Sequence, residues 1–223
     1  MTLHSGMGPV LVQRVALRNF KSFEKCNVSL GPLTILVGRN GSGKSNFLDA
    51  LEFTKDAVGQ SLDFAVRERA GIDGIRRRSR LNRPTHAHIE IELALPTGTA
   101  KYGFQLGDRR DSYDVRREQC VIRTNDVDCS YVIGGGQFQH WSVPNRPAPG
   151  DFEPDRLALP TLSGIPEFRP VYDAILAMAF HNLNPEIMKR PARPDTLRIL
   201  TSDGSNIATI IESLPDSSRK RVV

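Results

Sequence analysis

The sequence has few cysteines and no apolar run long enough to cross a membrane. Its 223 residues include only Cys26, Cys120 and Cys129, without CxxC spacing or histidine-rich surroundings. This odd number gives no indication of a disulfide framework or a zinc site, so we expect reduced thiols in a cytoplasmic protein. The best apolar stretch, 171–180, is shorter than the roughly 18 residues of a membrane helix. It also contains Asp173, so no membrane span is predicted.

Aromatic residues are scarce, at 7%, but the composition is otherwise that of a globular protein. Hydrophobic residues make up 39% and charged residues 25% of the chain, which excludes a disordered chain. The formal net charge of +5 permits an anionic partner without identifying one. The start of the chain lacks the basic and apolar regions of a secretory signal, and we expect a short flexible leader there.

The segment 10–59 has the pattern of two strands, a glycine-rich loop and a helix. Apolar and polar residues alternate over 10–23, which predicts a strand, and a second strand is predicted over 26–30. The stretch LTILVG at 33–38 is almost continuously apolar and predicts a strand buried on both faces of a sheet. From Lys44 to about Gly59, apolar residues at helical spacing predict a helix. These residues are Phe47, Leu48, Leu51 and Val58.

The middle of the chain changes from helical to strand periodicity. A helix interrupted at Gly71 is predicted over 62–80. A period of two over 86–141 predicts the strands of an antiparallel sheet. The proline-rich stretch 143–160 is expected to be an irregular connection.

The last quarter of the chain is predicted to be mostly helical. A buried helix is expected from Pro166 to Ala179, and 180–188 is expected to return to the sheet edge. A short strand and a turn are predicted over 197–206. Either Ser205 or Asn206, at the end of this stretch, can cap a last helix.

The glycine-rich loop matches the phosphate-binding (Walker A) motif G-x-x-x-x-G-K-[ST]. Its residues are Gly38, Arg39, Asn40, Gly41, Ser42, Gly43, Lys44 and Ser45, and Asn46 follows it among the candidate binding residues. The glycines let backbone N–H groups surround a phosphate chain at the positive end of a helix dipole. We expect Lys44 to contact the β- and γ-phosphates of ATP and the Ser45 hydroxyl to contact Mg²⁺. The alternative is a strand-to-helix turn that binds no ligand.

At these residues the chain resembles the amino-terminal lobe of the RecF/SMC/OLD group of ABC-type ATPases, and within it the predicted bacterial AAA-family ATPases. The resemblance is carried by LRNFKSF and LTILVGRNGSGKSNFLDAL, with weaker support from DFAVRERAGIDGIRRRS, AFHNLNPEIMKRP and SDGSNIATIIESL. It implies an α/β P-loop NTPase, similar to an ABC/SMC head, with an antiparallel β lobe next to the nucleotide-binding βα core. It also implies that Lys21 and Ser22 lie beside bound ATP; the alternative for both is a solvated basic turn.

Two motifs that the resemblance implies are missing from the chain. We find no four apolar residues followed by Asp-Glu, which would hold Mg²⁺ and orient water, and no signature loop. The glycine clusters at 133–137 and 162–164 imitate the signature, but they are predicted to be turns. The chain therefore looks like one amino-terminal lobe that leads to a missing lid and carboxy-terminal lobe. Within it we expect a core at 10–60, a helix and the antiparallel lobe at 61–150, and connecting helices at 151–223.

Two functions from different classes remain open. The first is an ATPase head lobe that binds Mg-ATP and dimerises with nucleotide, in DNA repair or phage defence. It would work as a homodimer or with a partner chain that supplies the missing motifs. The second is a binding module that holds ATP as a structural or regulatory ligand without turnover. A small-molecule kinase is disfavoured by the hairpin before the loop and the antiparallel lobe after it.

Other charged residues have weaker functional interpretations. The densest basic cluster could contact a DNA backbone, but it lacks interleaved aromatic residues, which favours a solvated or nucleotide-proximal surface. Its members are Arg67, Arg69, Arg76, Arg77, Arg78, Arg80 and Arg83. His86 and His88 share a strand face without a third metal ligand. Glu90 and Glu92 are interpreted as the solvent face of a strand. If the chain alone hydrolyses ATP, these two with Asp203 and Glu212 are the first candidate carboxylates.

Overall fold

The structure, a computed structural model, describes residues 11–78, 86–109, 112–125, 128–190 and 199–215. The chain divides into two compact units, Met1–Ala177 and Met178–Val223. The first unit combines one β-sheet with helices, and the second contains the short helices α6 (Pro185–Met188) and α7 (Ile207–Ser213). No helix within the described residues is long and apolar enough to cross a membrane.

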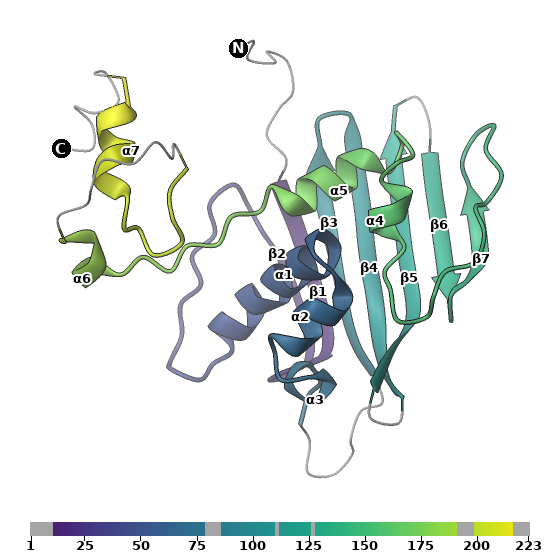
Figure 1. The fold of residues 1–223 in the computed structure, drawn as a ribbon, viewed down its shortest axis with the longest axis horizontal. Helices are drawn as coiled ribbons and strands as arrows, with labels where there is room; N and C mark the ends of the chain where they lie inside the picture. The colour runs from purple at the N-terminus through teal and green to yellow at the C-terminus, as the bar shows by residue number, and fades with distance from the viewer. Residues whose placement is uncertain (1–10, 79–85, 110–111, 126–127, 191–198, 216–223) are drawn as a thin grey trace. The chain divides into compact units, whose positions relative to one another are not determined.

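A seven-stranded antiparallel sheet forms the centre of the first unit (Figure 1). Its strand order is β2-β1-β3-β4-β5-β6-β7, so β3 pairs with β1 after a long helical excursion and the later strands follow as hairpins. The strands are β1 (Leu11–Phe20), β2 (Phe23–Ser29), β3 (His86–Leu95), β4 (Gly98–Arg109), β5 (Ser112–Thr124), β6 (Asp128–Gly134) and β7 (Gln137–Ser142). The prediction of an antiparallel sheet from the period of two is confirmed.

Helices cover one face of this sheet (Figure 1). They are α1 (Lys44–Gly59), α2 (Leu62–Arg67), α4 (Leu159–Leu162) and α5 (Arg169–Leu176), with the short α3 (Ile72–Ile75) beyond the break at Gly71. Every second side chain of β3 is buried, as the alternation of its sequence requires. The ring of Phe53 on α1 lies 6.2 Å from that of Phe20 and 6.0 Å from that of Phe104. The core therefore lies between α1 and the inner face of the sheet.

The prediction of a buried strand at 33–38 is wrong. The segment belongs to no strand, and Leu33, Ile35 and Val37 are 82%, 74% and 85% exposed. A strand buried on both faces needs neighbouring strands along both of its edges. The seven strands pair with one another, and none of the described residues pairs with 33–38. An apolar run indicates a preference for burial, but the neighbouring strands that would bury it must come from elsewhere in the fold.

Four other predictions need correction. The stretch 180–188 forms no strand, because α6 occupies its second half, and the described part of 197–206 forms turns instead of a strand. The helix predicted from Pro166 begins only at Arg169. Leu48, predicted to lie on the apolar face of α1, is 50% exposed. Nonetheless, the mixed α/β class with an antiparallel sheet is confirmed, while the details of an ABC/SMC-like head remain predictions.

Candidate nucleotide-binding site

The glycine-rich loop closes on itself in front of α1. Ser42 donates its backbone N–H to the Arg39 carbonyl at 3.1 Å, and a Cβ at position 38 would lie 2.8 Å from the Ser42 hydroxyl. Gly43 adopts a left-handed conformation with φ 98°, where side chains are disfavoured. A Cβ on Gly43 would also lie 2.9 Å from the Phe23 ring. Glycine at 43 therefore allows the loop to pack against the turn between β1 and β2.

The Lys44 side chain folds back into the loop. Its Nζ donates to the carbonyl oxygens of Gly38 at 2.7 Å and Arg39 at 3.0 Å. These contacts place the ammonium group against the backbone that the motif would wrap around a phosphate. The carbonyl oxygens of Gly38 and Arg39 thus accept the hydrogen bonds that Lys44 Nζ would donate to phosphate oxygens in a complex.

The amino terminus of α1 is suited to an anion. The helix has 16 residues, starts at Lys44 and carries no acidic residue in its first turn. Backbone N–H groups of a first turn have no acceptor within the helix, and the helix dipole makes this end positive. No carboxylate within that turn offsets the positive end, which leaves it available to a phosphate.

The turn between β1 and β2 contacts the start of α1, which brings Lys21 and Ser22 to the loop. The Ser22 hydroxyl accepts a hydrogen bond from Asn46 Nδ2 at 2.8 Å. Lys21 Nζ lies 2.6 Å from Asp49 Oδ2, one helical turn beyond Ser45. The turn is held in place by the Lys21 N–H, which donates to the Ile75 carbonyl at 2.8 Å. Contact of these residues with a nucleotide stays a prediction.

Asp49 is a site residue that the sequence analysis missed. Its other carboxylate oxygen lies 2.9 Å from Arg69 Nε, and Arg69 also contacts Asp56 at 3.1 Å. Arg69 is largely buried, and its guanidinium lies 5.1 Å from the centre of the Phe53 ring. Asp49 thus links a buried arginine to Lys21 at the loop. Asp49 follows Ser45 by four residues and therefore lies on the same side of the helix, and this spacing is the sequence signal that could have identified it.

The basic cluster predicted from the sequence is largely engaged in ion pairs. Arg76 is buried between Asp73 at 2.7 Å and Asp108 at 2.8 Å, which raises the pKa of its guanidinium against the lowering effect of burial. Arg77 pairs with Glu24 at 3.1 Å. Arg78 is exposed, whereas Arg80 and Arg83 lie outside the described residues. Two of the cluster's arginines, Arg69 and Arg76, are therefore structural.

The candidate carboxylates Glu90 and Glu92 do not lie in the loop region. Both belong to the sheet face opposite the helices, where Glu90 contacts Lys101 at 2.8 Å and Glu92 contacts Arg14 at 2.9 Å. Asp203 and Glu212 belong to the second unit. The Asp203 carboxylate accepts the Ser205 N–H at 3.0 Å, a hydrogen bond that lowers the pKa of Asp203.

Glu118 is a buried carboxylate that the sequence analysis also missed. It accepts hydrogen bonds from the hydroxyls of Tyr102 and Tyr131 at 3.0 and 2.9 Å, and from the backbone N–H groups of Ala158 and Leu159. Burial raises the pKa of Glu118, while these hydrogen bonds act in the opposite direction. With its oxygens occupied in this way, Glu118 fastens the start of α4 to the sheet. The alternation of buried and exposed positions along β5 puts Glu118 on the buried face, and this pattern is the sequence signal that could have identified it.

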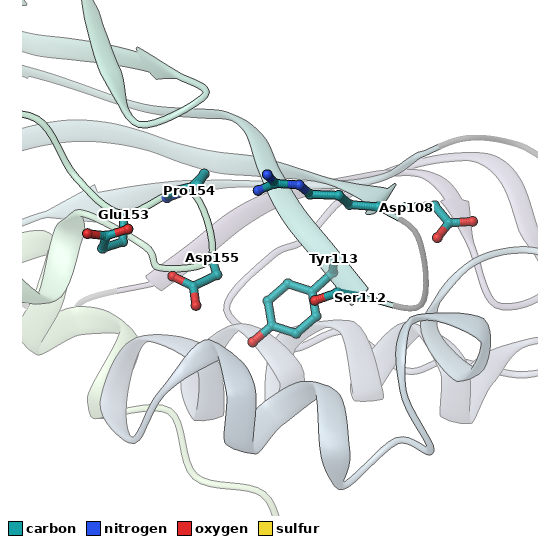
Figure 2. Close-up of a pocket in the computed structure, with 7 residues that line it drawn as sticks. Asp108, Ser112, Tyr113, Glu153, Pro154 and Asp155 are labelled. Atoms are coloured by element: carbon teal, nitrogen blue, oxygen red, sulfur yellow. The ribbon is translucent and has the colours of Figure 1, made fainter.

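A hollow lined by β5 and the connecting segment lies away from the loop (Figure 2). Ser112 and Tyr113 of β5 lie there opposite Glu153 and Asp155 of the connecting segment, around a cavity of about 730 Å³. Burial, reinforced by Asp63 and Asp155, raises the pKa of Tyr113 to about 12. The surplus of carboxylates in this hollow disfavours a phosphate ligand.

Comparisons with known proteins point to the same segment. Residues 11–91, which include β1, the loop and α1, match the model of the AAA ATPase domain family. The chain is 47% identical over 45 residues to the chromosome partition protein Smc of Methanocaldococcus jannaschii, covering 20% of this chain and 4% of that protein. It is 38% identical over 52 residues to the OLD nuclease of Thermus scotoductus, covering 23% of this chain and 10% of that protein. It is 43% identical over 42 residues to the endonuclease GajA of Bacillus cereus, covering 19% of this chain and 7% of that protein.

These matches confirm the resemblance to SMC/OLD-type ABC ATPases for the amino-terminal segment. The matched stretches amount to a tenth or less of each relative's length. A solved chain from work on ATP-driven dimerization and DNA-stimulated activation of SMC ATPases aligns with 95% of this chain and 96% of its own length. Its sequence identity is 17% and its TM-score 0.36, which is too low to support a common fold.

Proposed function

We propose that this chain is the ATP-binding lobe of an ABC/SMC-type ATPase, with the nucleotide held by residues 38–46. The observation that carries the proposal is the Lys44 ammonium within the closed loop, 2.7 and 3.0 Å from two loop carbonyls. On binding, phosphate oxygens replace these carbonyls as acceptors. Lys44 then contacts the β- and γ-phosphates, and backbone N–H groups of the loop and first turn contact the rest of the phosphate chain.

We further propose that Ser45 contributes its hydroxyl to Mg²⁺. Mg²⁺ prefers oxygen ligands and is usually held by one or two protein groups together with phosphates and water, which the exposed Ser45 allows. The ion would neutralise charge that develops on the phosphates. Lys21 and Ser22 complete the site from the side, because their turn is bonded to Asn46 and Asp49 of α1.

The chain alone is proposed to bind ATP without hydrolysing it. Among the described residues of the first unit, the candidate carboxylates Glu90 and Glu92 are held in ion pairs on the far face of the sheet. Glu118 is enclosed by four hydrogen-bond donors. Asp49, the carboxylate beside the loop, is held by Lys21 and Arg69. We therefore propose that the acidic residue that orients water comes from a carboxy-terminal lobe or a partner chain.

The exposed apolar segment supports such a partner. The side chains of Ile35 and Val37 are largely exposed, and within the described residues the backbone of 35–37 makes no hydrogen bond. Strands added along this segment would bury these two side chains and form hydrogen bonds with the backbone of 35–37. We propose nucleotide-dependent dimerisation or assembly with a second lobe, in DNA repair or phage defence.

The test is nucleotide binding by the Lys44→Ala variant. With a fluorescent ATP analogue and Mg²⁺, we expect an affinity loss of at least about 100-fold, because a charge-assisted phosphate contact is removed. Lys25→Ala, an exposed lysine on the far face, is the matched control and should bind like the parent. Unchanged affinity in Lys44→Ala, with an unchanged circular dichroism spectrum, would refute the role of the loop.

The alternative function, a non-hydrolysing assembly or regulatory module, is favoured by the engaged carboxylates. Steady-state phosphate release separates the two. An ATPase lobe should gain Lys44-dependent turnover when the missing lobe or partner chain is added. A regulatory module should bind ATP and assemble without gaining turnover.

A further inference from the structure

The face of the sheet opposite the helices contains a hollow of about 320 Å³, which we call the open-face hollow. Strand pairing explains its position, because Asn27 of β2, Ala16 of β1, Glu90 of β3 and Gly103 of β4 form one row across the sheet. Paired residues of antiparallel strands point to the same face. Ala16 and Gly103 add little or no side chain to this row, which leaves a concave space between longer neighbours. Its volume lies within the range of small-molecule sites, about 300–1,000 Å³.

The adjacent row of the sheet brings basic side chains from three strands to the hollow. Lys25 of β2 pairs with Arg18 of β1, Arg18 with His88 of β3, His88 with Gln105 of β4, and Gln105 with Arg117 of β5. All five of these residues line the hollow. Neighbouring strands are about 4.8 Å apart, so Lys25 and Arg18 form a close pair of cations. Arg117 lies three strand spacings from Arg18, at about 14 Å, on the other side of the hollow.

The acidic group of the hollow is already engaged. Of the described residues that line it, only Glu90 carries a carboxylate. One oxygen of Glu90 lies 2.8 Å from Lys101 Nζ, and the other accepts a hydrogen bond from Gln119 at 3.1 Å. Arg14, which also lines the hollow, is paired with Glu92 at 2.9 Å. These contacts leave no carboxylate of the lining to neutralise the remaining cations.

Three cations of the hollow are uncompensated. Arg18, Lys25 and Arg117 are exposed, and none of them forms an ion pair with another described residue. Arg117 makes only long hydrogen bonds, of 3.5 and 3.4 Å, to Gln119 and Gln139. The electrostatic environment therefore favours a ligand with negative charge concentrated near Arg18 and Lys25.

Uncharged polar groups lie between the two ends of the hollow. Burial lowers the pKa of His88; Glu90 acts against this, and Arg18 adds to it. A neutral His88 offers both a hydrogen-bond donor and an acceptor, and so does the amide of Gln105. Hydroxyl groups of a ligand can exchange hydrogen bonds with both side chains.

We propose that the open-face hollow binds the phosphate monoester of a small molecule, with the phosphate at Arg18 and Lys25 and the rest of the molecule toward Arg117. A phosphate monoester carries a charge of about −1.5 to −2 at pH 7 and three strong acceptor oxygens, which suits two adjacent cations. A sugar phosphate and a mononucleotide share this chemistry. The inference goes beyond the proposed function, because the hollow lies on the face opposite α1 and its occupation requires no bound ATP.

The experiment is titration calorimetry on the full 223-residue chain at constant ionic strength, with four probes: inorganic phosphate, ribose, ribose 5-phosphate and AMP. We expect saturable binding of ribose 5-phosphate, weaker binding of inorganic phosphate and none of ribose. Tighter binding of AMP than of ribose 5-phosphate would identify a mononucleotide as the ligand. Equal or weaker binding of AMP would identify a sugar phosphate.

Two variants test the two ends of the hollow. Arg18→Gln should weaken binding of both inorganic phosphate and ribose 5-phosphate by at least about tenfold, because it removes a charge-assisted contact with the phosphate. Arg117→Gln should weaken binding of ribose 5-phosphate by about threefold and leave that of inorganic phosphate unchanged. The control is Arg67→Gln, which removes the same charge from a side chain that is 78% exposed and lies outside the hollow. It should stay within about twofold of the parent.

Several results would overturn the proposal. One is the absence of saturable binding of either ester by the parent up to about 10 mM. Equal losses in Arg18→Gln and Arg67→Gln would show that net charge alone explains binding, and equal affinities for inorganic phosphate and both esters would leave a site for an adventitious ion only. If Arg18→Gln does not fold, Lys25→Gln removes the second phosphate contact and gives the same test.

The phosphate-binding loop serves as a separate control. Lys44→Ala should bind ribose 5-phosphate like the parent, and Arg18→Gln should bind the fluorescent ATP analogue like the parent. Loss of ribose 5-phosphate binding in Lys44→Ala would place the ester at the loop and overturn the proposal. Failure of this inference is therefore distinct from failure of the proposed function.

Discussion

The strand β3 and the segment 33–38 are both rich in apolar residues, yet they lie in opposite environments. β3 is paired along both edges, and its Ile91 is fully buried. The segment 33–38 is unpaired within the described residues, and its Ile35 is 74% exposed. The alternating sequence of β3 supplies one face for the core and one for solvent. The continuous apolar run needs partners on all sides, and strands that would provide them are not among the seven of this sheet.

The sharpest test of this contrast is the same substitution in both regions. We expect Ile91→Ala to lower the free energy of unfolding by about 2–5 kcal/mol, because it leaves a cavity in the core on the helix-covered face of the sheet. Ile35→Ala should lower it by less than about 0.5 kcal/mol, since the side chain is already exposed to water. Urea unfolding followed by circular dichroism measures both. A comparable loss in both variants would mean that 33–38 is buried in the chain alone.

A second test addresses the link between the sheet and the loop. Asp49→Asn should lower the free energy of unfolding by about 2 kcal/mol, because it removes one of the two carboxylates that pair with the buried Arg69. It should also weaken nucleotide binding by releasing Lys21. Asp63→Asn is the matched control, since its pair with Arg67 is exposed. We expect less than about 0.5 kcal/mol there. Similar stability in both variants would remove Asp49 from its linking role.

A third test acts on the loop region without touching the sheet. Ser45→Ala should weaken binding of the ATP analogue by about tenfold in the presence of Mg²⁺, which corresponds to one lost ligand contact of about 1.4 kcal/mol. With EDTA present the two proteins should bind alike. The affinity is measured by titration under both conditions. An equal loss of affinity with Mg²⁺ and with EDTA would contradict a contact between Ser45 and the metal.

The smallest expected effect is a pH dependence at His88, which lies on the face of the sheet opposite the helices. The pKa of His88 is lowered in the folded chain, chiefly by burial, so the unfolded chain binds more protons. Stability should therefore decrease as the pH falls through about 6.5, the ordinary value for histidine. His88→Gln should reduce this decrease, as measured by thermal unfolding at pH 7.5 and 5.5. Identical pH dependence in parent and variant would contradict the assignment.

Local patterns in the sequence predicted the elements whose partners lie nearby. The period of two over 86–141 encodes which face of each strand meets the core, and hairpins bring those strands together. The phosphate-binding motif fixed the position of the loop, because its glycines and the helix that follows are adjacent in sequence. The break at Gly71 was predicted for the same reason, and the structure places it between α2 and α3.

Features that depend on distant residues could not be predicted in the same way. The environment of 33–38 depends on neighbouring strands, and the short structured turns of 199–206 depend on Asn206, whose side chain bonds Thr201 and Ile199. The pairing of Arg69 with Asp49 joins positions 20 residues apart through tertiary packing. A basic stretch in sequence therefore gave no information on which arginines remain exposed.

Hydrogen–deuterium exchange with and without Mg-ATP tests the central claim most directly. The account predicts that amide exchange slows over residues 38–47, where backbone N–H groups would meet the phosphates, and in the turn at Lys21 and Ser22. Exchange in β3, β4 and β5 should be unchanged, and Lys44→Ala should abolish the protection. Protection that is absent from 38–47, or that persists in Lys44→Ala, would contradict ATP binding by this loop.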